Sequence, residues 1–92
     1  MILLKYFFTQ IYLMSKAFVL INCELGSENQ VISDLQTIDC VTHVYGVFGA
    51  YDILVSSECD QLEELRQMIM GKIRKIVNIR STITLIGIEG QC

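Results

Sequence analysis

The chain has 92 residues, 52% of them hydrophobic, and a formal net charge of −3 at pH 7. This length corresponds to one domain with a modest core, and the high apolar fraction predicts that part of its surface meets a partner. The negative charge argues against sequence-independent binding to nucleic-acid phosphates, because such binding needs a basic surface.

The cysteines do not have the spacing of a metal site. None of the four cysteines, Cys23, Cys40, Cys59 and Cys92, belongs to a CxxC pair, and the single His43 has no ligand-like neighbour in the sequence. We therefore expect no metal and no cofactor. No secretory pattern is visible, so the cysteines are interpreted as buried or incidental thiols of a cytoplasmic protein.

Residues 1–15 are expected to be an N-terminal extension. Residues 1–13 are mostly aromatic and aliphatic, but they are too short to cross a bilayer and lack a small-residue cleavage site. Two interpretations stay open: a misassigned start codon, with Met14 as the natural start, or a short helix that covers an apolar surface. Residues 90–92 are expected to be a tail.

The first elements are a strand and a helix. Residues 17–23 form a short apolar run, which predicts a strand buried on both faces. Ser27 and Gln30 have the spacing of a capping box, and the helix after them should end within residues 37–40. Its apolar positions recur at helical spacing: Val31, Ile32, Leu35 and Ile38.

A hairpin should follow. Residues 41–48 and 52–57 have strand composition, and their short connection predicts antiparallel pairing. Gly46 suggests a bulge and Gly49 a tight turn. Strict alternation would place four side chains of the first strand on one face: Val41, His43, Tyr45 and Val47.

The last elements repeat the order helix and strand. Asp60 and Glu63 have the spacing of a second capping box. The apolar stripe after them consists of Leu62, Leu65, Ile69 and Ile73. The final strand is expected over residues 80–88, with Thr82 and Thr84 on one face.

Two strand–helix–strand units in succession predict the α+β ferredoxin-like βαββαβ sandwich. Its four-stranded antiparallel sheet would carry both helices on one face. Both residue parities of the strands include large apolar side chains. The bare sheet face should therefore meet a second copy of the chain in a homodimer.

The pattern resembles the effector-binding domain of the Lrp/AsnC transcription regulators, also called the RAM domain. The resemblance covers residues 16–89 and is most specific at the Gly-x-Tyr-Asp element, residues 49–52. Thr82-Ile83-Thr84 supports it. The chain departs from the family at Asn78-Ile79, where Gly-Val is common.

The resemblance implies a non-enzymatic module that binds an amino acid and modulates transcription of amino-acid metabolism. It implies dimers that assemble into octamers or similar rings, mixing with full-length Lrp/AsnC regulators, and no contact with membranes. There is no room before Ala17 for a helix-turn-helix, so a stand-alone domain without direct nucleic-acid binding is expected.

The ligand site implied by the resemblance lies between dimers. Its expected residues are Gly49, Ala50, Tyr51, Asp52, Thr82 and Thr84. Asp52 suits an α-ammonium group, and backbone N–H groups of a glycine loop suit an α-carboxylate. The same residues also suit plainer roles, because Gly and Asp are common in turns and Thr in strands.

Two other functions stay open. A small ferredoxin-like enzyme of the monooxygenase or isomerase type would use His43, Tyr45 and Asp52 in a cleft of the sheet. A nucleic-acid or metal-ion module on the same fold would need basic flanks or paired cysteines, which the sequence does not show.

Overall fold

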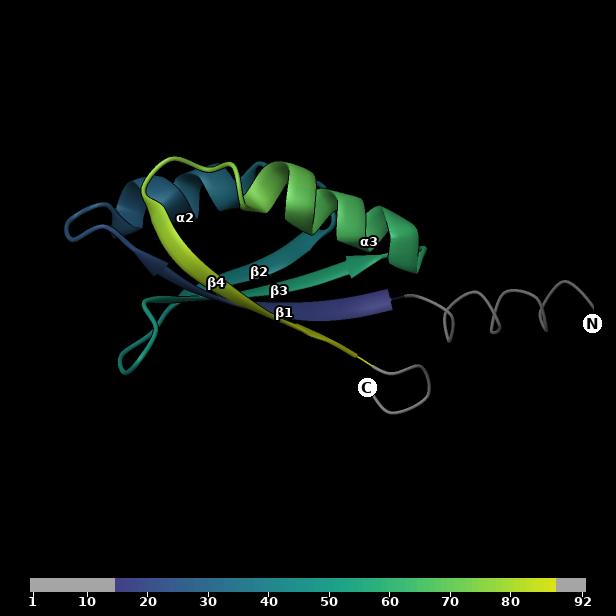
Figure 1. Ribbon diagram of the computed structural model, residues 1–92, viewed down its shortest axis with the longest axis horizontal. Helices are drawn as coiled ribbons and strands as arrows, with labels where there is room; N and C mark the ends of the chain where they lie inside the picture. The colour runs from purple at the N-terminus through teal and green to yellow at the C-terminus, as the bar shows by residue number, and fades with distance from the viewer. Residues whose placement is uncertain (1–14, 88–92) are drawn as a thin grey trace, which may run out of the picture.

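The computed structural model describes residues 15–87, and Figure 1 shows their arrangement. Almost all of the expected N-terminal extension and the tail lie outside these residues. The elements in chain order are β1 (Ser15–Cys23), α2 (Glu28–Gln36), β2 (Val41–Gly46), β3 (Ile53–Cys59), α3 (Leu62–Met68), a π-helical turn η1 (Ile69–Ile73) and β4 (Ile79–Ile86).

The four strands form one sheet in the order β2-β3-β1-β4, and every neighbouring pair is antiparallel. The two strand–helix–strand units therefore interleave, with β1 and β3 central and β2 and β4 at the edges. Both helices lie on one face of the sheet (Figure 1). The predicted ferredoxin-like sandwich is confirmed.

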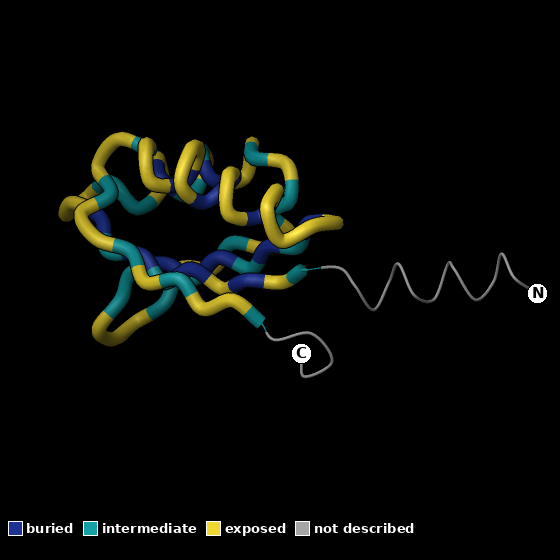
Figure 2. The backbone as a smooth tube through the Cα atoms, turned by 45° about the vertical axis from the view of Figure 1, so that its right-hand side comes forward, coloured by how far each residue is buried: buried dark blue, intermediate teal, exposed yellow. Residues whose placement is uncertain are grey.

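The core lies between the helices and the sheet (Figure 2). The strand residues Val19, Ile21, Ile53 and Val55 are fully buried beneath the helices. Alternate residues of β1 face away from the helices, and Phe18 is 40% exposed. The sequence predicted a first strand buried on both faces. Within one chain β1 is buried on one face only, because nothing in the described residues covers the second face.

The bulge lies elsewhere than predicted. The register of β2 with β3 shifts between Val41 and His43, so the extra residue is Thr42, not Gly46. The Thr42 hydroxyl donates to the Ser56 carbonyl oxygen at 3.0 Å, which satisfies that carbonyl beside the irregular pairing. The bulge turns Val41 onto the helix side of the sheet, where it packs against the core. The predicted shared face of Val41 and His43 is therefore wrong.

Neither predicted capping box forms. The Ser27 hydroxyl donates to the Glu24 carbonyl at 2.6 Å, and Gln30 reaches forward to Asp34 instead of back to the N-cap. The second helix is capped at Gln61, not Asp60, and makes no side-chain cap hydrogen bond. Its apolar stripe continues through η1, where Ile69 and Ile73 are buried.

The cysteines also differ from expectation. Cys40 and Cys59, expected as separate thiols, form a disulfide that joins the start of β2 to the end of β3. Cys23 is a free, buried thiol, as predicted. None of the helices in residues 15–87 is both long enough and apolar enough to cross a membrane.

Candidate functional site

The Gly-x-Tyr-Asp loop joins β2 to β3. The Val47 N–H donates to the Asp52 carbonyl at 2.9 Å, which closes the loop. Gly49 has φ +134°, a conformation that residues with a side chain rarely adopt. Gly49 and Ala50 are exposed and Tyr51 is half-buried, so this part of the loop is available to a partner.

Asp52 fastens this loop to the end of β1. Its carboxylate Oδ2 accepts the Cys23 N–H at 3.0 Å, and its own N–H donates to the Ile21 carbonyl at 3.0 Å. The half-buried Asp52 therefore has a positional role, which the sequence left open beside ligand binding.

A cavity of about 510 Å³ adjoins Asp52 at the meeting point of three segments. These are the end of β1 with its following turn, the start of α2 and the start of β4. The lining residues are Asn22, Cys23, Leu25, Glu28, Asp52, Arg80 and Ser81. A volume of this size falls within the usual range for small-ligand pockets, about 300–1,000 Å³.

The cavity carries charges of both signs. Glu28 and Asp52 supply carboxylates, and Arg80 supplies a guanidinium group. Arg80 also forms an exposed ion pair with Glu24, with an N–O distance of 3.7 Å. Such exposed pairs contribute little to stability, so Arg80 can exchange this partner for a ligand at small cost.

Cys23, whose thiol is free and buried, is one of the residues that line this cavity. Burial raises its pKa above the ordinary value, and the nearby Asp52 and Glu28 carboxylates add to the rise, while a hydrogen bond with Ser27 opposes it. The thiol is therefore neutral near pH 7 and is poorly suited to act as a nucleophile.

Of the six predicted ligand residues, Asp52 lines this cavity and the other five do not. Thr82 and Thr84 are half-buried on the edge strand β4, opposite Ile21 and Val19 of β1. The structure thus separates the loop residues 49–51 and the two threonines from the cavity within one chain.

Sequence reasoning missed Asn22, Glu28, Arg80 and Ser81. The pairing of Asn22 with Ser81 in the sheet brings together residues 59 positions apart, and their side chains approach to 3.5 Å. The predicted topology already placed the end of the first strand beside the start of the last. That topology could have indicated a site between these two strand ends. The sequence did not give the strand register, which is needed to identify the individual residues.

His43 and Tyr45, the candidates for an enzymatic site, lie elsewhere. Their rings stack on β2 with centroids 5.8 Å apart and an interplanar angle of 8°. They line a second cavity of about 260 Å³, to which Asp52 does not contribute. The three residues proposed for an enzyme are therefore not brought into one pocket.

The fold is that of a small α+β domain, and its cavity has the size of a small-ligand pocket. The sequence model of the family described as the Lrp/AsnC ligand binding domain matches residues 16–89. The chain belongs to this family.

Curated relatives are transcription regulators. The chain is 37% identical over 70 residues to an uncharacterized HTH-type transcriptional regulator of Pyrococcus abyssi, covering 76% of this chain and 44% of that protein. It is 33% identical over 58 residues to the regulatory protein AsnC of Escherichia coli K12, covering 63% of this chain and 38% of that protein. The chain thus spans less than half the length of these relatives.

Solved structures share the fold. A hypothetical protein from Pyrococcus horikoshii is 39% identical, with a TM-score of 0.76 over 80% of this chain and 89% of that one. AsnC of E. coli is 26% identical, with a TM-score of 0.79 over 89% of this chain and 56% of that one.

Proposed function

We propose that this domain binds a free amino acid in the cavity beside Asp52 and serves as an effector-binding module of transcription regulation. The observation that carries the proposal is the pairing of two carboxylates, Glu28 and Asp52, with the Arg80 guanidinium around one cavity. Membership of the ligand-binding family and the regulatory relatives support it.

An amino acid presents one charge of each sign on adjacent atoms. Its α-ammonium group needs a carboxylate, which Asp52 or Glu28 supplies, and its α-carboxylate needs a donor such as Arg80. Asn22 and Ser81 offer further hydrogen-bonding groups along the same wall. Leu25 is 97% exposed at the rim, where it gains burial when an apolar ligand side chain packs on it.

The open sheet face supports assembly of the domain. The residues Phe18, Tyr45, Ile83 and Leu85 are 40%, 47%, 45% and 54% exposed. The strand pairings place them on the side opposite the core residues Val19 and Val55, so they share one apolar surface. A second copy of the chain buries this surface in a face-to-face homodimer.

Contacts between such dimers would complete the ligand site. Residues 49–51 are exposed or half-buried, and Thr82 and Thr84 lie on an edge strand. We propose that they reach a ligand held by a neighbouring dimer in an octamer or similar ring. In this way binding changes assembly, with itself or with full-length Lrp/AsnC regulators.

Calorimetric titration of the purified chain with each common amino acid tests binding. Arg80→Gln and Asp52→Asn should each weaken binding at least tenfold, because each removes a charge that a zwitterion needs. Glu24→Gln is the matched control, since it removes the ion-pair partner of Arg80 without removing a cavity residue. Absence of binding at millimolar concentration, or equal affinities for all three variants, would refute this site.

Sedimentation tests assembly separately. Leu85→Lys should shift the chain toward monomer, because it places a charge in the proposed apolar interface. Val77→Lys is the control, since Val77 is 72% exposed but precedes β4 and lies outside the sheet. An unchanged oligomeric state in Leu85→Lys would reject the sheet-face dimer.

A further inference from the structure

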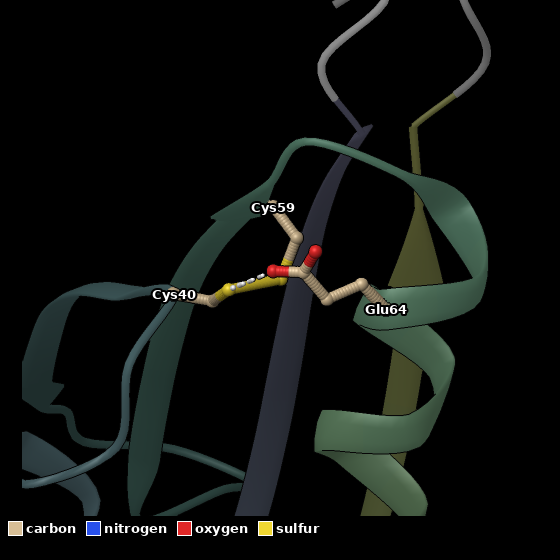
Figure 3. Close-up of side chains that lie close together, drawn as sticks. All are labelled: Cys40, Cys59 and Glu64. Atoms are coloured by element: carbon tan, nitrogen blue, oxygen red, sulfur yellow. Dashed lines mark hydrogen bonds between the residues drawn. A yellow bond between two sulfur atoms is a disulfide. The ribbon is translucent and has the colours of Figure 1, made fainter.

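Three metal-binding side chains converge at the end of the sheet where β3 finishes. Cys40 precedes β2, Cys59 is the last residue of β3, and Glu64 lies in the first turn of α3. One ligand atom from each lies within 4.8 Å of the others. Figure 3 shows the three side chains pointing toward one another, and none of them lines the amino-acid cavity.

The backbone holds these residues in place. The Cα atoms of Cys40 and Cys59 are 5.2 Å apart, and the Glu58 N–H donates to the Cys40 carbonyl at 2.7 Å. Cys40 has φ +75°, in the left-handed region that a residue with a side chain seldom occupies. On the helix side, the fully buried Leu65 anchors the turn of α3 that carries Glu64.

The Glu64 carboxylate is what distinguishes this cluster from a disulfide alone. Its Oε1 lies 3.5 Å from Cys40 Sγ. A disulfide needs no carboxylate beside it, and in the reduced chain an anionic group next to two ionising thiols is repulsive. A divalent cation among the three groups is attracted by the carboxylate and by both thiolates, which removes this repulsion.

One distance in the cluster already fits zinc, and the two sulfurs, which are bonded to each other in the disulfide, separate when the bond is reduced. With Zn–S near 2.3 Å and Zn–O near 2.1 Å, the sulfur–oxygen edge of a tetrahedral site is about 3.6 Å. The observed separation between Cys40 Sγ and Glu64 Oε1 is 3.5 Å. Cys59 is 2% exposed, whereas Glu64 is exposed, so the cluster has a buried side and a side open to solvent.

We propose that Cys40, Cys59 and Glu64 bind one Zn²⁺ ion when their disulfide is reduced, with water in the fourth position. A dithiol reductant gives two electrons and two protons to the S–S bond, which breaks to leave two thiols, while the dithiol itself becomes a disulfide. Zn²⁺ then binds both sulfurs as thiolates and releases their two protons to solvent. Disulfide and metal site are alternative states of the same sulfurs.

The expectation of no metal site rested on spacing along the sequence. These ligands come from three separate elements, and the Cys40–Cys59 pair alone spans 19 positions. Metal motifs recognised from a sequence have shorter and more regular spacings. A metal site whose ligands are brought together only by tertiary folding is therefore not recognised from such spacings.

The experiment uses the full chain carrying Cys23→Ser and Cys92→Ser, so that only the Cys40 and Cys59 thiols remain. The protein is reduced, two thiols are verified with a thiol reagent, and Co²⁺ is titrated anaerobically as a spectroscopic substitute for Zn²⁺. Stoichiometric binding with a thiolate-to-cobalt charge-transfer band and the visible bands of tetrahedral Co²⁺ is expected, and Zn²⁺ should displace the cobalt. The oxidised protein should bind neither ion.

Variants separate this site from adventitious binding. Cys40→Ser should lose the charge-transfer band expected of a two-thiolate site and bind Co²⁺ only weakly. Circular dichroism shows whether this variant is folded. Glu64→Gln should weaken Zn²⁺ binding at least tenfold, whereas Glu63→Gln, one position earlier on the same exposed helix turn, should not. The proposal is overturned if no thiolate band forms, or if Glu64→Gln and Glu63→Gln bind Zn²⁺ equally.

Discussion

The role of Asp52 can be tested by separating its hydrogen bond from its charge. In the folded chain its carboxylate accepts the N–H of Cys23, a residue that is 5% exposed. Asp52→Ala removes the acceptor and leaves a buried N–H unsatisfied. The cost of such a group is about 1–3 kcal/mol.

Asp52→Asn keeps a side-chain oxygen that can accept the same N–H, but it loses the charge. Hydrogen bonds to charged groups contribute about 1 kcal/mol more than neutral ones, so this variant should lose about 1 kcal/mol. In a domain of this size, each kcal/mol lowers Tm by about 4–8 °C. We therefore expect a fall of about 4–8 °C for Asp52→Asn and about twice that for Asp52→Ala.

Thermal unfolding followed by circular dichroism measures both variants against Asp39→Ala. Asp39 is exposed and has no side-chain hydrogen bond to the described residues, so its loss should change stability by less than about 0.5 kcal/mol. Equal Tm values for Asp52→Ala and Asp39→Ala would refute the positional role. Calorimetric titration of Asp52→Asn then measures how the Asp52 charge affects amino-acid affinity. If this variant is folded but does not bind an amino acid, the Asp52 charge is needed for ligand binding.

Three further predictions follow from the backbone and the cysteines. Gly49→Ala should lose roughly 1–3 kcal/mol, because φ +134° strains any residue with a side chain, whereas Gly71→Ala in η1 should be neutral or gain up to about 1 kcal/mol; urea unfolding compares them. The pKa of the Cys23 thiol is higher in the folded chain than in the unfolded chain, where it is near 8.5. The neutral thiol therefore contributes its full stabilisation of the fold below about pH 8.5, and this contribution is lost as the pH rises through the folded pKa. The urea midpoint should therefore fall between about pH 7 and pH 10 by more in the native chain than in Cys23→Ala, and equal falls would contradict this. Reduction of the Cys40–Cys59 disulfide, which closes a loop of 19 positions, should cost about 3 kcal/mol in metal-free buffer, and Cys40→Ala should not respond to reductant.

Part of the architecture could be predicted because it depends on local periodicity. The continuous apolar run of residues 17–23 indicated a strand, and the helical spacing of Val31 and Leu35 indicated a helix. Two strand–helix–strand units in succession then leave few topologies for a chain this short. The Gly-x-Tyr-Asp element could also be singled out, because it is the most specific part of the resemblance to the Lrp/AsnC family.

The cavity and the cysteine cluster could not be predicted, because they depend on how separated segments align. Asn22 and Ser81 meet through the register of β1 with β4, which no local pattern encodes. The bulge at Thr42 changes the face of Val41, and strict alternation cannot foresee an inserted residue.

The sequence by itself determined the order of the elements and the family, and it singled out Asp52 as a candidate site residue. Only the tertiary structure decided that Asp52 joins Arg80 around one cavity and that Cys40, Cys59 and Glu64 share one end of the sheet. The physical reason is that secondary structure follows from contacts between near neighbours in the chain. A site depends on side chains that only strand register and helix docking bring together.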